Sequence, residues 1–187
     1  MLFGEKMNVT DPLVLPRTGK VLKNRTVLAA MTNKQSHENG ILSEEEKKWL
    51  IRRAKGDFGI ITTAATNVTE NGRGWVGEMG VWGDHQIPEL KNLARELKKN
   101  GAVSLAQLFH GGMRAPKGIN GVQPISASIN TEPGMNGVYT RALSHEEIIE
   151  MVQSFTDAAV RCHKACLLYT SDAADDTPCV DLGGRRI

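Results

Sequence analysis

Hydrophobic and polar positions form two kinds of segment along the chain, short apolar runs and longer amphipathic stretches. The short runs are apolar and β-branched throughout, as in strands buried on both faces of a parallel sheet. The amphipathic stretches carry apolar residues on one side at helical spacing. In chain order, the pattern predicts strands at 26–30, 58–66 and 102–108, followed in turn by helices at 43–56, 84–101 and 144–165. Three consecutive βα units indicate an α/β fold with a parallel sheet.

The predicted helices carry local start signals and apolar faces. Ser43 with Glu46, and Ser144 with Glu147, both fit a capping box, in which each side chain accepts a backbone N–H of the other residue. Pro88 stands near the start of the second helix. The apolar face of the second helix consists of Ile87, Leu90, Leu93, Ala94 and Leu97. That of the third consists of Ile148, Val152, Phe155, Ala159 and Cys162.

The two ends of the chain depart from this pattern. Residues 13–24 hold two short apolar runs around a turn, which predicts a hairpin that would plug the N-terminal end of a barrel. After Ala165 the periodicity stops, and the polar, acidic residues 171–177 precede Pro178. We therefore expect the fold to occupy residues 1–165. Residues 166–187 are interpreted as a tail that is disordered or artefactual, and their string is similar to translated adaptor sequence fused to a reading frame.

Composition narrows the class of protein. The 187 residues are 40% hydrophobic and 24% charged, with a net charge of +2, so neither nucleic acid nor an anionic membrane is an expected partner. The sequence has no apolar run of about 18 residues and no signal-like apolar core, and we expect a cytoplasmic protein. Cys162, His163 and Cys166 are too few for a zinc site, so no metal is expected. Oligomeric state is not indicated.

Three motifs invite a chemical interpretation. "GRGWVG" at 72–77 matches G-x-G-x-x-G, but no helix follows it to hold a pyrophosphate, and we interpret it as a loop. "AAMT" at 29–32 and "AQLFHGGMR" at 106–114 follow or end predicted strands, where βα barrels carry their chemistry. Taken alone, the first motif is more often explained by core packing followed by a loop, and His110 fits a structural role just as well, but the position of both motifs at strand ends favours a functional role. The uncharged Gln107 amide offers a donor and an acceptor to a ligand.

The chain resembles the N-terminal half of the old yellow enzyme family, the FMN-dependent NADH:flavin oxidoreductases and ene-reductases. The resemblance rests on "NRTVLAAMTNKQS", "RAKGDFGIITTAATNV" and "NGAVSLAQLFHGGMR", in that order, and on the helical segment that ends at Ala165. It implies a (β/α)8 TIM barrel truncated to about three βα units plus the hairpin. It also implies FMN as cofactor, NAD(P)H as reductant, and an activated alkene such as an enone as the small-molecule substrate.

The resemblance also implies particular cofactor contacts. The backbone of the segment around Met31 would contact the flavin ring, the Thr32 side chain would bond near flavin O4, and Gln107 would bond the pyrimidine edge. The full set of implied FMN-binding residues is Ala29, Ala30, Met31, Thr32, Ala64 and Gln107. Many relatives have Pro at the position of Ala30, and some carry an aromatic side chain at that of Lys34, so substrate contacts there are open.

The resemblance implies that the family's catalytic residues lie beyond this segment: a paired histidine or histidine–asparagine anchor for the substrate carbonyl after the fourth strand, with a proton-donating tyrosine nearby. It also implies that the arginine and backbone amides that bind the FMN phosphate come from the late strands. The catalytic residues of this chain are therefore not assigned from its sequence. Two alternatives stay open: a non-enzymatic truncated remnant unable to bind FMN, and a part of a multidomain relative of the dienoyl-CoA reductase or amine dehydrogenase type. The truncated chain alone is expected to be inactive.

Overall fold

Within the described residues the central sheet has five parallel strands, of which four lie in the spatial order β3 (Val27–Leu28), β4 (Ile60–Asn67), β6 (Val103–Phe109) and β9 (Leu168–Ser171). The computed structural model describes residues 7–16, 19–131 and 138–171. A two-residue strand, β5 (Met79–Gly80), pairs with the end of β4. Parallel neighbours need crossover connections. These contain the helices α1 (Glu44–Lys55), α2 (Ile87–Lys99) and α4 (His145–Lys164).

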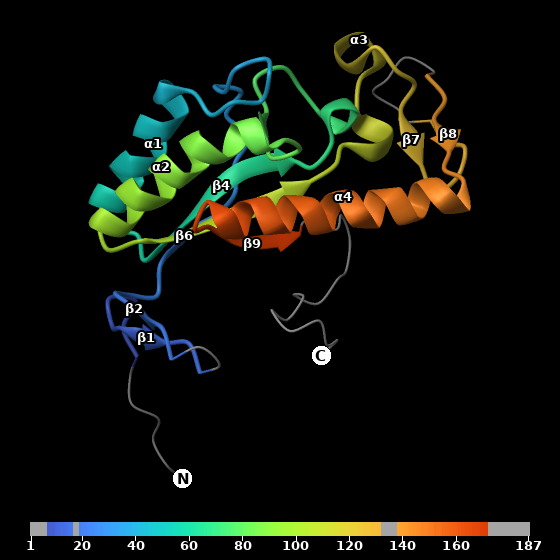
Figure 1. Ribbon diagram of the computed structural model, residues 1–187. Coiled ribbons are helices and arrows are strands. Elements are labelled where there is room, and N and C mark those ends of the chain that lie inside the picture. The colour runs from blue at the N-terminus through green and yellow to red at the C-terminus, as the bar shows by residue number, and fades with distance from the viewer. Residues whose placement is uncertain (1–6, 17–18, 132–137, 172–187) are drawn as a thin grey trace.

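The hydrophobic core lies between the sheet and these helices, which run side by side along it (Figure 1). Helix α2 packs against α1 on one side and α4 on the other. The apolar face predicted for α2 is confirmed, because Leu90, Leu93 and Leu97 are at most 1% exposed. The predicted order of three βα units is confirmed as well. The first strand is shorter than predicted, since only Val27 and Leu28 pair with β4.

The predicted hairpin is also present. Strands β1 (Leu13–Val14) and β2 (Val21–Leu22) pair in antiparallel fashion, with Leu13 opposite Leu22. The Lys23 ammonium group that follows donates a hydrogen bond to the carbonyl of Asn100 at 3.1 Å and forms an ion pair with Asp57 at 2.8 Å. Asp57 and Asn100 lie in the short turns just before β4 and β6, so the hairpin lies near the amino ends of the sheet strands.

Helix α4 differs from the sequence expectation in two ways: the N-terminal part of its apolar face is exposed, and a strand follows its C-terminal end. Of its predicted apolar face, Cys162 is fully buried, whereas Ile148 is 44% and Val152 63% exposed. The reason is that the core elements reach only the C-terminal half of α4 among the described residues. Past the boundary expected near Ala165, strand β9 follows α4 and pairs in parallel with β6, Leu168 opposite Leu105. The remainder of the predicted tail, 172–187, lies outside the described residues.

Short elements fill the connections. The single-turn 3-10 helices are η1 (Glu70–Gly72), η2 (Asp84–Gln86) and η3 (Gly112–Arg114). Between η3 and α4 lie α3 (Lys117–Asn120), β7 (Ile125–Ser126) and β8 (Arg141–Ala142). Across the described ranges, no helix is long and apolar enough to cross a membrane.

The two predicted capping boxes have different outcomes. At α4 the box is complete, because Ser144 accepts the Glu147 amide and Glu147 accepts the Ser144 amide. At α1 only half of it forms. The Ser43 hydroxyl accepts the amide of Glu46 at 3.1 Å, but the Glu46 carboxylate accepts a hydrogen bond from the Ser36 hydroxyl instead. The prediction of a full box at Ser43 was therefore wrong for its second hydrogen bond.

Candidate functional site

A pocket of about 410 Å³ lies where the carboxyl ends of β3, β4 and β6 meet. Parallel strands bring their carboxyl ends to one edge of the sheet, and the residues that follow them therefore gather there. Strands β4 and β6 contribute Ala65, Gln107 and Phe109 to the pocket wall. The segments that follow the strands contribute the other lining residues, among them Trp75 and Arg114. The lining residues are Ala30, Met31, Thr32, Ala65, Gly74, Trp75, Gln107, Phe109 and Arg114.

Four of the six residues assigned by the resemblance line this pocket together. Ala30, Met31 and Thr32 come from the segment after β3, and Gln107 comes from β6. Ala29 is exposed and does not line the pocket.

Ala64 also lies outside the wall. The pairing register between β4 and β6 shifts between Thr62 and Ala65, which sets Ala65 opposite Gln107. Ala64 is only 5% exposed, and its carbonyl accepts hydrogen bonds from the hydroxyls of Thr63 and Thr66. A local irregularity in the strand thus brings Ala65, which the sequence did not single out, to the lining in place of Ala64.

Gln107 has the chemistry expected of a ligand contact. Its side chain is half-buried, and its backbone N–H donates to the Thr63 hydroxyl at 3.3 Å. Its side-chain amide makes no hydrogen bond within the described part of the chain. One donor and one acceptor are therefore available in the pocket, next to the short side chains of Ala30 and Ala65. Short side chains and a free amide fit the approach of a flat, polar-edged ring such as that of a flavin.

Sequence reasoning missed the aromatic side of the pocket. Trp75 and Phe109 are in contact with ring centroids 5.6 Å apart and an interplanar angle of 43°, and Arg114 lines the same cavity. Trp75 belongs to the "GRGWVG" segment. The interpretation of this segment as a loop is confirmed, because no helix begins in it. Its position after strand β4 is the signal that could have drawn attention to Trp75.

His110 has a structural setting. Its Nδ1 accepts the amide N–H of Gly112 at 2.9 Å, and burial lowers the pKa of its imidazole, which favours the neutral ring. A Cβ at Gly72 would lie 2.4 Å from this ring. The amide of Gly111 donates to the Gly72 carbonyl at 2.7 Å. His110 therefore helps to join the loop after β6 to the loop after β4.

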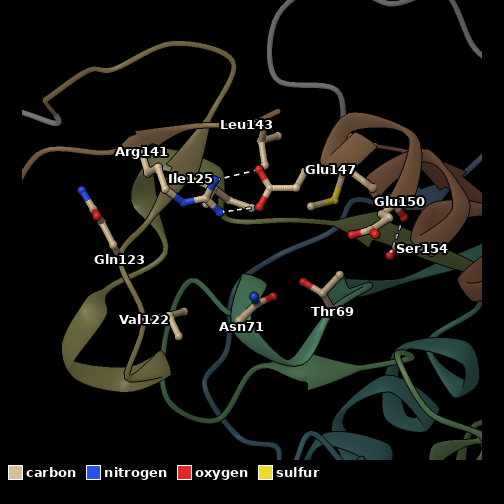
Figure 2. A pocket seen from close by; sticks show the side chains of 11 residues that line it. Thr69, Asn71, Val122, Gln123, Ile125, Arg141, Leu143, Glu147, Glu150 and Ser154 are labelled. Atoms are coloured by element: carbon tan, nitrogen blue, oxygen red, sulfur yellow. Dashed lines mark hydrogen bonds and ion pairs between the residues drawn. The ribbon is translucent and has the colours of Figure 1, made fainter. Parts of the chain in front are cut away.

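A second cavity, of about 400 Å³, lies between η1, the β7–β8 pair and α4. Figure 2 shows Arg141 and Glu147 pointing toward each other at its edge. Two hydrogen bonds of 2.7 Å join them. The guanidinium is therefore engaged by the protein itself. None of the six residues assigned by the resemblance lines this cavity.

The remaining features lie away from the strand carboxyl ends. A groove of about 920 Å³ between α2 and the amino end of β6 includes Arg95, Lys98 and Cys166. Burial raises the pKa of the Cys162 thiol to about 12, so this cysteine is an unreactive core residue. Within the described ranges, no three His, Cys, Asp or Glu side chains gather as a metal site would require.

Comparisons with known proteins agree on one family. The model of the NADH:flavin oxidoreductase / NADH oxidase family matches residues 11–167. The chain is 32% identical over 149 residues to the probable NADH-dependent flavin oxidoreductase YqiG of Bacillus subtilis (strain 168), covering 80% of this chain and 40% of that protein. A solved old yellow enzyme homologue from Zymomonas mobilis has a TM-score of 0.76 at 25% identity, covering 86% of this chain and 46% of the other.

A solved complex of 2-naphthoyl-CoA reductase with 2-naphthoyl-CoA has a TM-score of 0.80 at 26% identity, covering 86% of this chain and 26% of that one. These structural neighbours are TIM barrels, so the expected fold class is confirmed. The described residues form one part of such a barrel, and their sheet is open. The chain spans about 40% of the length of YqiG.

Proposed function

The chain belongs to the NADH:flavin oxidoreductase / NADH oxidase family, and on that basis we propose that it forms the FMN-facing first part of an enzyme that reduces activated alkenes, such as enones. FMN with NAD(P)H as reductant is the cofactor pair of the family. The observation that carries the proposal is the convergence of Ala30, Thr32 and Gln107 on one pocket at the strand ends.

Each residue has a proposed task. The backbone of residues 29–32 lies against the flavin ring, and the Thr32 hydroxyl bonds near O4. The Gln107 amide donates to and accepts from the pyrimidine edge, which requires both of its hydrogen-bonding functions. Ala64 contributes through the backbone of β4, with the methyl group of Ala65 on the wall. FMN held by these residues would supply hydride transfer, through N5, from NAD(P)H to the β-carbon of the substrate.

Trp75 and Phe109 have a complementary task on the aromatic side. Their rings are in contact and cover part of the pocket wall, so they limit the access of water to it. Exclusion of water strengthens the hydrogen bonds that a polar ring edge makes inside the pocket. The protein side of the site therefore combines a polar contact at Gln107 with an apolar enclosure.

The proposal is tested by flavin binding to the 187-residue chain. FMN and riboflavin are titrated separately, and quenching of flavin fluorescence is measured. We expect weak binding of both, equal within about twofold, and a colourless purified chain, because the resemblance assigns the phosphate contacts to later strands. Gln107→Ala should weaken binding about fivefold to tenfold, corresponding to roughly one hydrogen bond.

The matched control is Gln123→Ala, which removes an amide from the second cavity and should leave flavin binding unchanged. If Gln107→Ala and Gln123→Ala weaken binding alike, the pocket is not the flavin site. If neither flavin is quenched, the result favours the alternative of a truncated remnant unable to bind FMN. A yellow chain retaining one FMN would overturn the expectation that the phosphate contacts lie elsewhere.

A further inference from the structure

Glu78 is a buried acid with no part in the pocket wall. It lies between the "GRGWVG" loop and β5, and the residue is 2% exposed. Its Oε2 accepts the amide N–H of Gly74 at 2.6 Å, whereas its Oε1 is buried without a hydrogen-bond partner within the described residues. Burying a carboxyl group with half of its capacity unused is costly. A buried acid of this kind therefore calls for an explanation.

The hydrogen bond from Gly74 fixes the residue immediately before Trp75. A Cβ at Gly74 would lie 3.4 Å from the Phe109 ring and 3.8 Å from the Glu78 carboxylate, so this glycine sits between the two. The indole of Trp75 is in contact with the same Phe109 ring. Gly74, Trp75 and Phe109 all line the pocket. The carboxyl group therefore lies directly behind the backbone that presents the indole.

The two ends of the loop have other anchors. Arg73 donates to the carbonyl of Glu70 at 3.2 Å and to that of Glu38. Gly77 accepts the amide of Ser36 at 3.0 Å. Between these anchors, the hydrogen bond to Glu78 is what fixes the segment that carries Trp75. We propose that Glu78 is a positioning residue, which holds Trp75 against Phe109 through the backbone of the loop and so shapes the aromatic wall of the pocket.

The electrostatic setting makes this role measurable. Burial raises the pKa of Glu78 to about 8, and the amides of Gly74 and Trp75 and the charge of Arg73 offset part of the rise. His110, which packs on Gly72, and Arg114, which lines the pocket, are titratable groups of the loop after β6. The loop after β3, which is bonded to Arg73 and Gly77, also carries Lys34, His37 and Glu38, and Glu70 lies at the start of the loop after β4. Glu78 is therefore mostly protonated at neutral pH and ionises just above it. Ionisation of Glu78 converts the neutral carboxyl group that accepts the Gly74 amide, next to Trp75, into a charged carboxylate.

The test uses the full 187-residue chain labelled with 5-fluorotryptophan, which gives one 19F resonance each for Trp49, Trp75 and Trp82. Trp75→Phe assigns the resonance of interest. In the unsubstituted chain, we expect the Trp75 resonance to shift with a midpoint near pH 8. In Glu78→Gln, which mimics the protonated acid, it should stay at its low-pH position. In Glu78→Met, which lacks the acceptor, it should move toward the value of the free amino acid.

Glu46→Gln is the control, because it neutralises another buried acid and should leave the Trp75 titration intact. A Trp75 titration that persists in Glu78→Gln would overturn the proposal, and so would a Trp75 resonance in folded Glu78→Met identical to that of the parent. The Trp49 and Trp82 resonances report whether Glu78→Met folds, and if it does not, Glu78→Gln decides alone. The significance for a flavin rests on the proposed function, but the measurement needs no flavin, so the two can fail separately.

Discussion

Helices α1 and α4 begin with the same motif, a serine followed three residues later by a glutamate, and use it differently. Both serines accept the amide of their glutamate, Ser43 at 3.1 Å and Ser144 at 3.2 Å. At α4, Glu147 completes the box and forms two hydrogen bonds with Arg141. At α1, Glu46 is fully buried and bonds to Ser36, a residue of the loop after β3.

The difference teaches what a local motif determines and what it leaves open. The serine hydroxyl fixes where the helix starts, since it needs only backbone groups within the same turn. The glutamate side chain is long enough to reach another partner, and tertiary contacts decide which one it takes. At α1 the partner is the loop that continues from the proposed flavin contacts at 29–32, so Glu46 links a helix start to the site.

The largest expected difference between the two helix starts is in the free energy of unfolding when each glutamate is replaced with alanine. Glu46→Ala leaves the Ser36 hydroxyl buried without its acceptor and opens a cavity. It should lower the free energy of unfolding by about 1–3 kcal/mol. Glu147→Ala exposes its partners to water and should cost clearly less. Urea unfolding followed by circular dichroism measures both, and Glu46→Gln, which keeps an acceptor, is the control. Equal losses in the two alanine variants would contradict the distinction.

The next largest expected effect is that Glu46 and Glu147 contribute to stability with opposite dependences on pH. Burial raises the pKa of Glu46 above its usual value of 4.5, offset in part by the Ser36 hydroxyl. The folded state then retains a proton that the unfolded chain releases, and this contribution to stability falls as pH rises above about 4.5. Hydrogen bonds from Arg141 and from the Ser144 amide lower the pKa of Glu147 to about 2. Its contribution is present above 4.5 and is lost as pH falls through 2.

Unfolding free energies measured from pH 2 to pH 7 separate the two acids. Glu46→Gln should remove part of the decline on the neutral side, whereas Glu147→Gln should flatten part of the rise on the acid side. Because Glu147 is exposed, its contribution should also shrink in high salt. If both variants change the same limb of the profile, the assignment of the buried and exposed acids is wrong.

Much of the fold could be predicted because its signals are local. The helix starts at Ser43 and Ser144 and the apolar face of α2 depend on residues a few positions apart. The length of the apolar face of α4 could not be predicted in the same way. Burial of Val152 requires a neighbouring element, and a periodic pattern contains no information about which neighbours are present. Strand β9 was not expected either, because only its pairing with β6 distinguishes it from the polar residues that follow.

The residues of the candidate site likewise fall into those that could be predicted from the sequence and those that depend on tertiary contacts. Thr32 and Gln107 were singled out because strand ends gather at one edge of a parallel sheet, which follows from topology alone. The exchange of Ala64 for Ala65 depends on a register shift between two strands. Trp75 depends on the hydrogen bond from Gly74 to a buried acid four residues further on. The register shift and this hydrogen bond are details that no residue pattern in the sequence encodes, although the position of Trp75 after strand β4 could have drawn attention to it.

The smallest effect concerns the serines themselves. Replacing an N-cap serine with alanine costs about 1 kcal/mol. After Ser144→Ala, the Glu147 carboxylate still accepts the amide of residue 144, so half of the box survives. After Ser43→Ala no such substitute exists, because Glu46 is bonded to Ser36. Ser43→Ala should therefore be the more costly of the two by a few tenths of a kcal/mol, measured as the difference in urea midpoint at unchanged slope.

The double variant Ser43→Ala with Glu46→Gln tests whether Glu46 takes no part in capping α1. If Glu46 plays no part in the cap, the two losses add, whereas a substantial coupling energy would show that Glu46 also supports the helix start.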